Sequence, residues 1–432
     1  MKRLKWETRL SLLSLCGQLL SYMLGLLLAR RLGIEGFEAY AVASAAFVLM
    51  VTLAPQGLEK YSLKLLPPLL EHGEHALLRG YLQFACRRVL LGCLLVGLPV
   101  ALLAWRAEGL APQARTAIVV SCLSLPAGAL VHLGLEVLTA AGRASRAALV
   151  FRVIVPGTAL LAACALLALV PQVRAPWMIG AWGLAWCVAL ALMLQDARRT
   201  ALPAAFAKAA VEAPSAWTSG ARPFWIYRVS LAVLAQAGVV ALQALQPSPT
   251  AVGAFAAAAG TAAIVQVLAT ATNRVYASRL SVLLELRDVR GIARLHRERL
   301  RWLVAPLLVY LTVVFAFAPR LVALFRPEFA DDGANALRIL AAATALSTLL
   351  AIFPTYLKHR GENRTLFRTV AVAAVVQVVL LVALVPVSGA TGAAIAYGIA
   401  AAFMYVNLAR LARRAHRELR PPPHDRPNHG NE

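Results

Sequence analysis

The stretch ARRLGIEGFEAYAVAS, Ala29–Ser44, ends one long apolar run and begins another. Two arginines close the first run, and Gly33 and Gly36 permit a tight turn before the second. The fragment AYAVA inside this stretch returns about 215 residues later as AFAAA at 254–258. An apolar run, a glycine turn and a distant repeat together predict a duplicated bundle of long helices.

Runs of this kind fill most of the chain. It has 432 residues, of which 60% are hydrophobic and 15% are charged, whereas a soluble domain has about 25% charged residues. A helix needs about 20 apolar residues to cross a bilayer. The sequence therefore predicts an all-α, polytopic membrane protein with about twelve spans, at 9–29, 39–58, 88–105, 116–137, 149–170, 177–195, 225–245, 251–272, 302–318, 335–356, 369–386 and 391–409.

The repeat divides these spans into two halves. AWGLA at 181–185 matches AYGIA at 396–400 with the same offset as the first pair. Six spans per half make the two repeats parallel, with a cleft between two lobes. We therefore predict an N-terminal six-helix lobe, a cytoplasmic linker, a C-terminal six-helix lobe and a disordered cytoplasmic tail, at 1–200, 201–222, 223–411 and 412–432.

The basic residues predict the orientation. With the N-terminus inside, the cytoplasmic segments hold about 35 of the 43 Lys and Arg residues, so both termini are expected in the cytoplasm. The net charge of +23 then reflects topology and attraction to anionic membrane lipids. The basic residues are dispersed rather than gathered in one patch, which argues against a nucleic-acid partner. The six cysteines contain no C-x-x-C pair, and we expect neither a metal nor a cofactor.

Polar residues inside predicted spans are the candidates for function. Two neighbouring spans each carry three polar residues within an arc of about 80° of the helix surface. They are Arg228, Gln236 and Gln243 on the seventh span, and Gln266, Asn273 and Arg274 on the eighth. One interpretation is that the glutamines join helices while the arginines extend to headgroups. Our hypothesis is that the two stripes bind an anionic substrate, with phosphate held by arginine.

Acidic residues are scarce in the spans. The acids near spans are Glu59 and Glu136, both close to cytoplasmic ends, and we predict a coupling or gating role for them. His132 shares a helical face with Glu136, which is more typical of a satisfied polar contact than of a proton relay. The sequence has no Walker loop, G-x-S-x-G or H-E-x-x-H motif, so we do not expect an enzyme.

Several segments carry a family resemblance. LLLARRLGIEGFEAYAVASAAFVLMVTLAPQGLEKYSLKLLP at 26–67 resembles the first two spans of the polysaccharide transporter branch of the multidrug/oligosaccharidyl-lipid/polysaccharide (MOP) exporter superfamily. VGAFAAAAG at 252–260, LVALFRPEFADDGANALRILAAATAL at 321–346 and SGATGAAIAYGIA at 388–400 are similar to that branch in its second half. The chain departs from the pattern at Glu38, which replaces a turn glycine.

The resemblance implies a flippase of the bacterial cytoplasmic membrane. Such a protein carries polyprenyl-diphosphate-linked oligosaccharide to the outer leaflet for O-antigen, capsule or exopolysaccharide synthesis. It would work by alternating access of two lobes around a cationic cavity, beside glycosyltransferases and a glycan polymerase.

Three other functions are less favoured by the sequence. A drug or cation antiporter of the same superfamily needs a carboxylate in the membrane, and the first span has none. A major-facilitator carrier would have a G-x-x-x-D-R-x-G-R loop, which is missing between Glu59 and Arg88. A membrane enzyme of glycan assembly would need a cluster of Asp, His or Arg in a sizeable loop, and no such cluster is visible.

Overall fold

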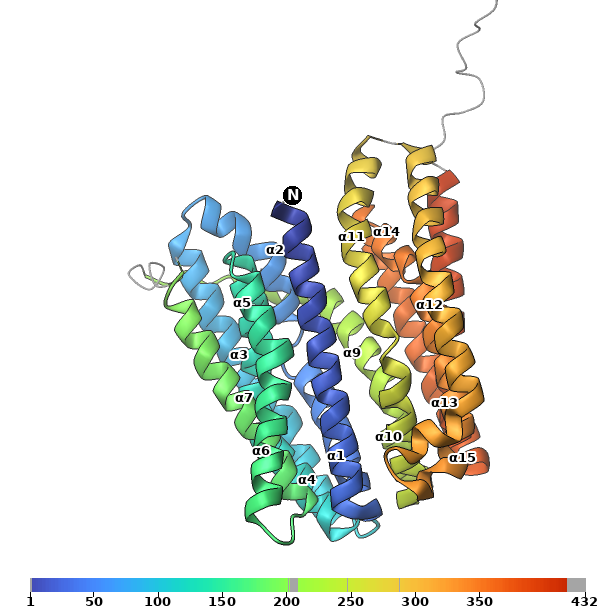
Figure 1. Cartoon of the computed structure of the whole chain (residues 1–432). Coiled ribbons are helices and arrows are strands. Elements are labelled where there is room, and N and C mark those ends of the chain that lie inside the picture. The colour runs from blue at the N-terminus through green and yellow to red at the C-terminus, as the bar shows by residue number, and fades with distance from the viewer. Residues whose placement is uncertain (1, 201, 203–208, 247, 287, 418–432) are drawn as a thin grey trace, which may run out of the picture.

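The computed structural model describes residues 2–200, 202, 209–246, 248–286 and 288–417, without the side chains of residues 2–10, 274, 275, 278 and 417. Within these ranges the regular structure is entirely helical. Figure 1 shows two bundles of helices side by side, which we name the N-terminal lobe and the C-terminal lobe. The fold is thus an all-α, polytopic membrane fold, as predicted.

The N-terminal lobe contains eight elements, coloured from blue to green in Figure 1. They are α1 (Lys2–Leu53), α2 (Leu58–Glu71), α3 (His75–Arg106), α4 (Pro112–Ala140), α5 (Ala144–Leu149), the π-helical turn η1 (Val150–Ile154), α6 (Val155–Leu169) and α7 (Ala175–Ala197).

The C-terminal lobe contains a further eight, coloured from green to red. They are α9 (Pro214–Leu245), α10 (Pro249–Ala263), α11 (Gln266–Glu285), α12 (Val289–Ala323), the 3-10 turn η2 (Pro327–Phe329), α13 (Ala330–Leu350), α14 (Ile352–His359) and α15 (Asn363–Arg417). Helix α9 begins inside the predicted linker, part of which lies outside the described residues. Most of the predicted tail lies outside them too.

Two helices are long enough to cross a membrane twice. Ten helical segments of the described chain are long and apolar enough to span, and two of them measure 43 residues (Ser11–Leu53) and 54 residues (Asn363–His416). Straight helices of those lengths would extend about 65 and 80 Å, against about 30 Å of hydrocarbon. Each is broken by a glycine with positive φ, Gly33 at 76° and Gly389 at 50°. The turn quoted at Gly33 is therefore a real reversal of the chain, and the twelve predicted crossings are accounted for.

The outer surface of the bundles is apolar. Leu103 on α3 is 70% exposed, and Val382 on α15 is 59% exposed. Such side chains would be costly in water, and they belong in lipid. Small residues, chiefly alanines, fill the interior where helices approach closely. The hydrophobic pattern thus gives each helix a small-residue face toward the bundle and a bulky face toward the membrane.

The lobes meet along one seam. Helix α1 packs against α9 and α10, and α2 packs against α9. The start of α1, helix α2 and the adjoining ends of α11 and α12 lie at one end of the molecule, upper in Figure 1, which we name the N-terminal face. The other end is named the opposite face. We use these two faces to state toward which end of the molecule the space between the lobes opens.

Candidate functional site

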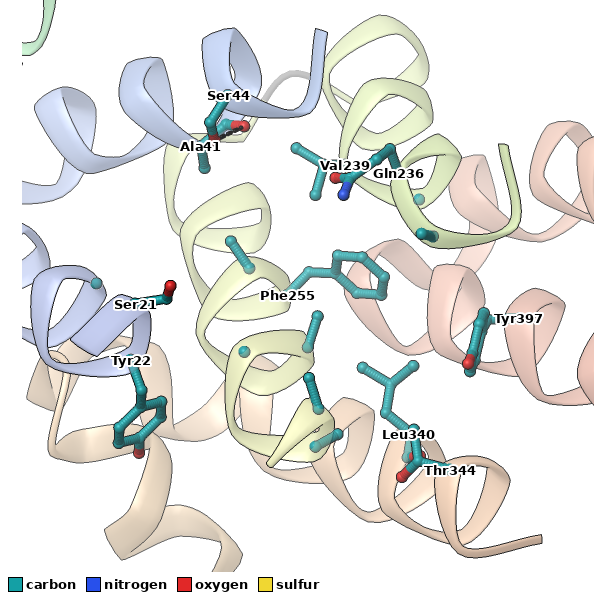
Figure 2. Close-up of a pocket in the computed structure, with 18 of the residues that line it drawn as sticks. Ser21, Tyr22, Ala41, Ser44, Gln236, Val239, Phe255, Leu340, Thr344 and Tyr397 are labelled. Carbon is teal, nitrogen blue, oxygen red and sulfur yellow. Dashed lines mark hydrogen bonds between the residues drawn. The ribbon is translucent and has the colours of Figure 1, made fainter. Parts of the chain in front are cut away.

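A cavity of about 440 Å³, named here the central cleft, lies between the lobes. Helix α1 supplies one wall, and α9, α10, α13 and α15 supply most of the other. Figure 2 shows Ser21 and Tyr22 of α1 on one side and Phe255, Leu340 and Tyr397 of the C-terminal lobe on the other. The cleft therefore belongs to both lobes, so a movement between them would change its shape.

The lining of the central cleft is neutral but polar. Its walls offer phenol, hydroxyl and amide groups among small apolar residues. The larger polar ones are Tyr22, Tyr40, Gln236, Gln266, Gln377 and Tyr397. None of the described side chains that line the cleft is an Asp, Glu, Lys or Arg. The site therefore offers hydrogen bonds and aromatic surfaces rather than a charge.

A second cavity of about 320 Å³, named the upper cavity, continues from the cleft toward the N-terminal face. The two cavities share Leu234, Ala235, Gln266 and Tyr397, and the upper one adds Asn273 of α11. Its described lining is again uncharged. The central cleft and the upper cavity together form a path from the middle of the molecule toward the N-terminal face.

Gln377 is the most deeply buried of the three glutamines that line the cleft. Its side chain is 99% buried, since 1% of its surface is exposed, and Nε2 donates a hydrogen bond of 3.2 Å to the Leu234 carbonyl oxygen. Its Oε1 atom is buried and has no hydrogen-bond partner. An unpaired buried acceptor is costly unless a ligand or water satisfies it. Gln377 thus leaves one buried acceptor unsatisfied at the wall of the cleft.

The cleft is closed toward the opposite face. Arg30 Nε donates to the Leu324 carbonyl oxygen across the lobes at 2.7 Å, and Arg326 Nη1 donates to the Ala29 carbonyl oxygen at 3.3 Å. Beside these contacts, at the wall of the cleft, four aromatic rings from both lobes form a cluster, which we name the aromatic seal. Its members are Tyr22, Phe37, Phe325 and Phe329, with neighbouring centroids 5.4 to 6.2 Å apart.

The structure distributes the predicted substrate-binding residues over several places. Gln236 lines the central cleft, Gln266 lines both cavities, and Asn273 lines the upper cavity. Asn273 Nδ2 also donates a hydrogen bond of 3.3 Å to the Ala351 carbonyl oxygen. Arg274 lies on α11, and its side chain is outside the described residues.

Arg228 and Gln243 contact the N-terminal lobe instead of the cavities. The Arg228 Nε atom lies 3.6 Å from Glu59 Oε1 of α2, so this ion pair joins the lobes. Gln243 hydrogen-bonds to Glu38, a carboxylate of α1 that is 98% buried with 2% of its surface exposed. Both residues have structural partners in this conformation, as the alternative interpretation of the polar stripes expected. A substrate role for them stays a prediction.

Glu59 and Glu136 lie in one charged cluster near the contact between α2 and α4. Lys60 donates a hydrogen bond to Glu136, while Glu59 is 99% buried and neither of its oxygens has a hydrogen-bond partner. Burial raises the pKa of Glu59 above its usual value, and the Arg228 guanidinium opposes this only in part. Glu59 is therefore a carboxyl that can gain or lose a proton at an interface between lobes.

Sequence reasoning missed three buried polar groups. Glu38 was read as a turn residue just outside a span, so Glu59 and Glu136 were wrongly taken as the only acids near spans. Gln377 stands alone in an apolar run, and only the tertiary packing shows that it faces the cleft. Arg299 lies in a basic segment, yet it is fully buried and donates to the carbonyl oxygens of Thr348 and Leu349 at 2.9 and 3.0 Å.

Comparison with solved structures shows the fold. An inward-facing conformation of a multidrug resistance MATE family transporter of the MOP superfamily is similar, with a TM-score of 0.76, 15% identity and coverage of 94% of this chain and 95% of that chain. An outward-facing conformation of a multidrug resistance MATE family transporter of the MOP superfamily has a TM-score of 0.63 and 14% identity, with 96% of both chains covered.

A MOP superfamily transporter from Pyrococcus furiosus, described as having a binding pocket of reverse polarity, has a TM-score of 0.66 and 16% identity, with 96% of both chains covered. No family model and no curated protein matches the chain. At these identities the likeness establishes the MATE-type fold of the MOP superfamily. The TM-score is higher against the inward-facing structure than against the outward-facing one.

Proposed function

We propose that this protein is a transporter that moves polyprenyl-diphosphate-linked oligosaccharide across the bacterial cytoplasmic membrane by alternating access. The observation that carries this proposal is the central cleft, which is polar and uncharged over its described lining. Sugars are rich in hydroxyl groups and carry no obligatory charge, so amide and phenol groups match them. The MATE-type fold supports a transporter of the MOP superfamily. The resemblance of several sequence segments to the polysaccharide transporter branch supports that branch.

The cleft could bind sugar through two kinds of contact. The free Gln377 Oε1 would accept a hydrogen bond from a sugar hydroxyl, and Gln236 and Gln266 would add donors and acceptors. The tyrosine rings would cover the apolar faces of the sugar while their hydroxyls stay polar. Because the prenyl tail is apolar, it would remain in lipid outside the cleft. Only the head of the substrate would then need to pass between the lobes.

The arginines of the first hypothesis have a more limited role in this proposal. In the present conformation Arg228 contacts Glu59 and lies away from the lining of both cavities. We propose that Arg228 and Arg274 meet the diphosphate at the rim, when the lobes move. Replacing either arginine by alanine should then slow transport of the diphosphate-linked cargo. Normal transport by both properly inserted variants would exclude this role.

We propose that coupling acts through the charged cluster of the N-terminal lobe. The cytoplasm would lie at the N-terminal face, so Glu59 would be near it, and protonation would neutralise one partner of the Glu59–Arg228 contact between lobes. Glu136 would hold Lys60 in place beside it. Loss of this contact would favour separation of α2 from α9. Glycosyltransferases and a glycan polymerase are proposed partners because they would make and use the cargo.

A drug or cation antiporter is the second candidate, and the likeness to multidrug MATE transporters favours it. A cation in the cleft would need a nearby carboxylate to replace its water. The described lining of the cleft offers none, and Glu38 and Glu59 already have partners elsewhere. Aromatic rings alone give a weaker site for a cation. The chemistry of the lining therefore favours a cargo whose head in the cleft is an uncharged sugar.

Reconstituted vesicles test the two candidates. The purified chain would be placed in vesicles with a fluorescent polyprenyl-diphosphate oligosaccharide, and a glycosidase that cannot cross the membrane would report movement of the glycan. We expect movement, slowed roughly fivefold by Gln377→Leu because one hydrogen bond is lost. Asn407→Leu on the same helix is the matched control, since Asn407 lies outside both cavities and bonds to the Phe403 carbonyl.

Two outcomes decide against the flippase. The first is no glycan movement while the same vesicles expel a cationic dye, which would establish the antiporter. The second is equal slowing by Gln377→Leu and Asn407→Leu, which would show that the cleft does not bind the sugar.

A further inference from the structure

The C-terminal lobe has a third cavity, of about 310 Å³, which is separate from the space between the lobes. It lies among α11, α12, α14 and the end of α15, at the N-terminal face. It shares no lining residue with the central cleft or the upper cavity. We name it the basic pocket. The proposed transport cycle gives it no task.

Its lining combines cations with aromatic rings. Arg297 and His296 come from α12, and Arg413 and His416 come from α15. The His296 ring lies against Phe353 of α14, with centroids 5.1 Å apart. Leucine and isoleucine side chains that belong to the core of the lobe form the floor. A pocket with a basic rim and an apolar floor suits an anion that is attached to an apolar or aromatic body.

The positive charge of the pocket is not neutralised from within the described chain. No Asp or Glu lines the pocket, and neither Arg297 nor Arg413 takes part in an ion pair among the described residues. The nearby Glu298 forms an ion pair with Arg279 of α11, whose Nη1 atom lies 3.6 Å from Glu298 Oε1. Arg279 is outside the lining of the pocket. Two guanidinium groups, those of Arg297 and Arg413, therefore border one small volume, and a bound anion would relieve their repulsion.

We propose that the basic pocket binds a phosphate group. Two guanidinium groups can bind several oxygens of one phosphate at once. A carboxylate has fewer oxygens and would match the two groups less well. The position at helix ends near one face is also the level of lipid headgroups. Two sources can supply this group: the headgroup of an anionic phospholipid, and a soluble diphosphate. The proposal is independent of transport, because it concerns binding to one lobe.

Binding to the purified full-length chain tests the proposal with two probes. The midpoint of thermal unfolding would be recorded in detergent with dioleoyl phosphatidylglycerol, and separately with inorganic diphosphate, each against dioleoyl phosphatidylcholine as the reference. We expect phosphatidylglycerol or diphosphate to raise the midpoint in a saturable way. In the double variant Arg297→Gln/Arg413→Gln the apparent affinity should fall about tenfold or more, since two charge-assisted contacts are lost.

A matched variant separates a built pocket from general positive charge. Arg290→Gln/Arg414→Gln removes two exposed arginines from the same two helices outside the pocket lining, and it should bind as the unmodified chain does. Ala293→Phe would fill the pocket while keeping every charge, and it should abolish binding. Saturation by diphosphate alone would identify a soluble ligand, and saturation by phosphatidylglycerol alone would identify a lipid. Binding of neither probe, or equal losses in both double variants, would overturn the proposal.

Discussion

The two lobes stabilise buried charged side chains in different ways. In the N-terminal lobe acids and bases pair, as in Lys60–Glu136 and in Arg146–Asp196, where Arg146 Nε is 3.1 Å from Asp196 Oδ2. In the C-terminal lobe the fully buried Arg299 donates to two carbonyl oxygens at the end of α13. A helix C-terminus is partly negative, so it can hold a cation without a carboxylate.

The predicted duplication of the chain makes this comparison direct. Asn273 and Ala351 lie 213 and 215 residues beyond Lys60 and Glu136, close to the offset of the repeated fragments. In each lobe the two positions are in contact, by a charged pair in the first and by a neutral hydrogen bond in the second. The two contacts therefore join corresponding positions of the predicted repeats but differ in their chemistry. We expect sensitivity to pH to be concentrated in the N-terminal lobe, because its contacts contain carboxylates.

The largest effect is expected for Arg299→Met in the C-terminal lobe. The change removes the Arg299 donors from one buried and one partly buried carbonyl oxygen, which should lower the free energy of unfolding by about 3 kcal/mol or more. Because no carboxylate takes part in these two hydrogen bonds, the loss should not vary as the pH is lowered from neutral. Thermal unfolding in detergent would measure it. Arg301→Met, an exposed neighbour, should have little effect, and equal losses for both would remove the distinction between the lobes.

The contact between lobes comes next. Arg228→Met removes the cation beside the buried Glu59, which should cost about 2–3 kcal/mol at neutral pH, less than a fully buried pair because Arg228 is partly exposed. The pKa of Glu59 is raised in the folded protein, so its contribution to stability is full at low pH and is lost as pH rises above 4.5. The cost of Arg228→Met should therefore shrink in acid.

Glu59→Gln provides the control for that pH dependence. It should flatten the fall in stability above pH 4.5, because the group that titrates is gone. An unchanged pH profile in Glu59→Gln would show that another carboxyl is responsible.

A smaller loss is expected for Lys60→Met. Lys60 is about one-third exposed, with 32% of its side chain accessible, so water can partly replace it beside Glu136. We expect a decrease of about 1–2 kcal/mol in the free energy of unfolding. Lys64→Met on the exposed side of α2 controls for loss of charge. Identical unfolding midpoints for the two variants would mean that the pair does not stabilise the lobe.

The smallest effect belongs to Asn273→Ala, the counterpart in the second lobe. Only one neutral hydrogen bond, 3.3 Å long, is removed, so about 0.5–1 kcal/mol is expected at every pH. Unfolding midpoints at several pH values would measure it beside Lys60→Met. A loss from Asn273→Ala that equals or exceeds the loss from Lys60→Met would reverse the comparison.

The fold was accessible from the sequence because its determinants are local. Run length predicts a span, and the glycines of the quoted turn predict a reversal that the structure places at Gly33 with a φ of 76°. The interior of each lobe follows from the small residues on one helical face. Boundaries were less accurate, since α9 starts about three turns before its apolar run.

The candidate site was only partly accessible, because its contacts join distant segments. Gln236 and Gln266 were selected from a polar stripe, and both line the cleft. The partner of Arg228 lies 169 residues away on another lobe, which helical periodicity cannot reveal. Gln377 carries no pattern, since it is one amide in an apolar run. Burial of such a group is a property of packing rather than of its neighbours in sequence.

The aromatic seal has a consequence for the electrical state of the membrane. Tyr22 and Phe325 come from different lobes and meet edge to face, with centroids 5.4 Å apart, and Phe325 also lies 6.2 Å from Phe37. A dry barrier of rings offers an ion no replacement for its hydration shell, so inorganic ions would not leak through the resting protein. In the proposed transport cycle these rings would part each time the lobes exchange access. The seal would then let a wide cargo pass while the membrane keeps its voltage.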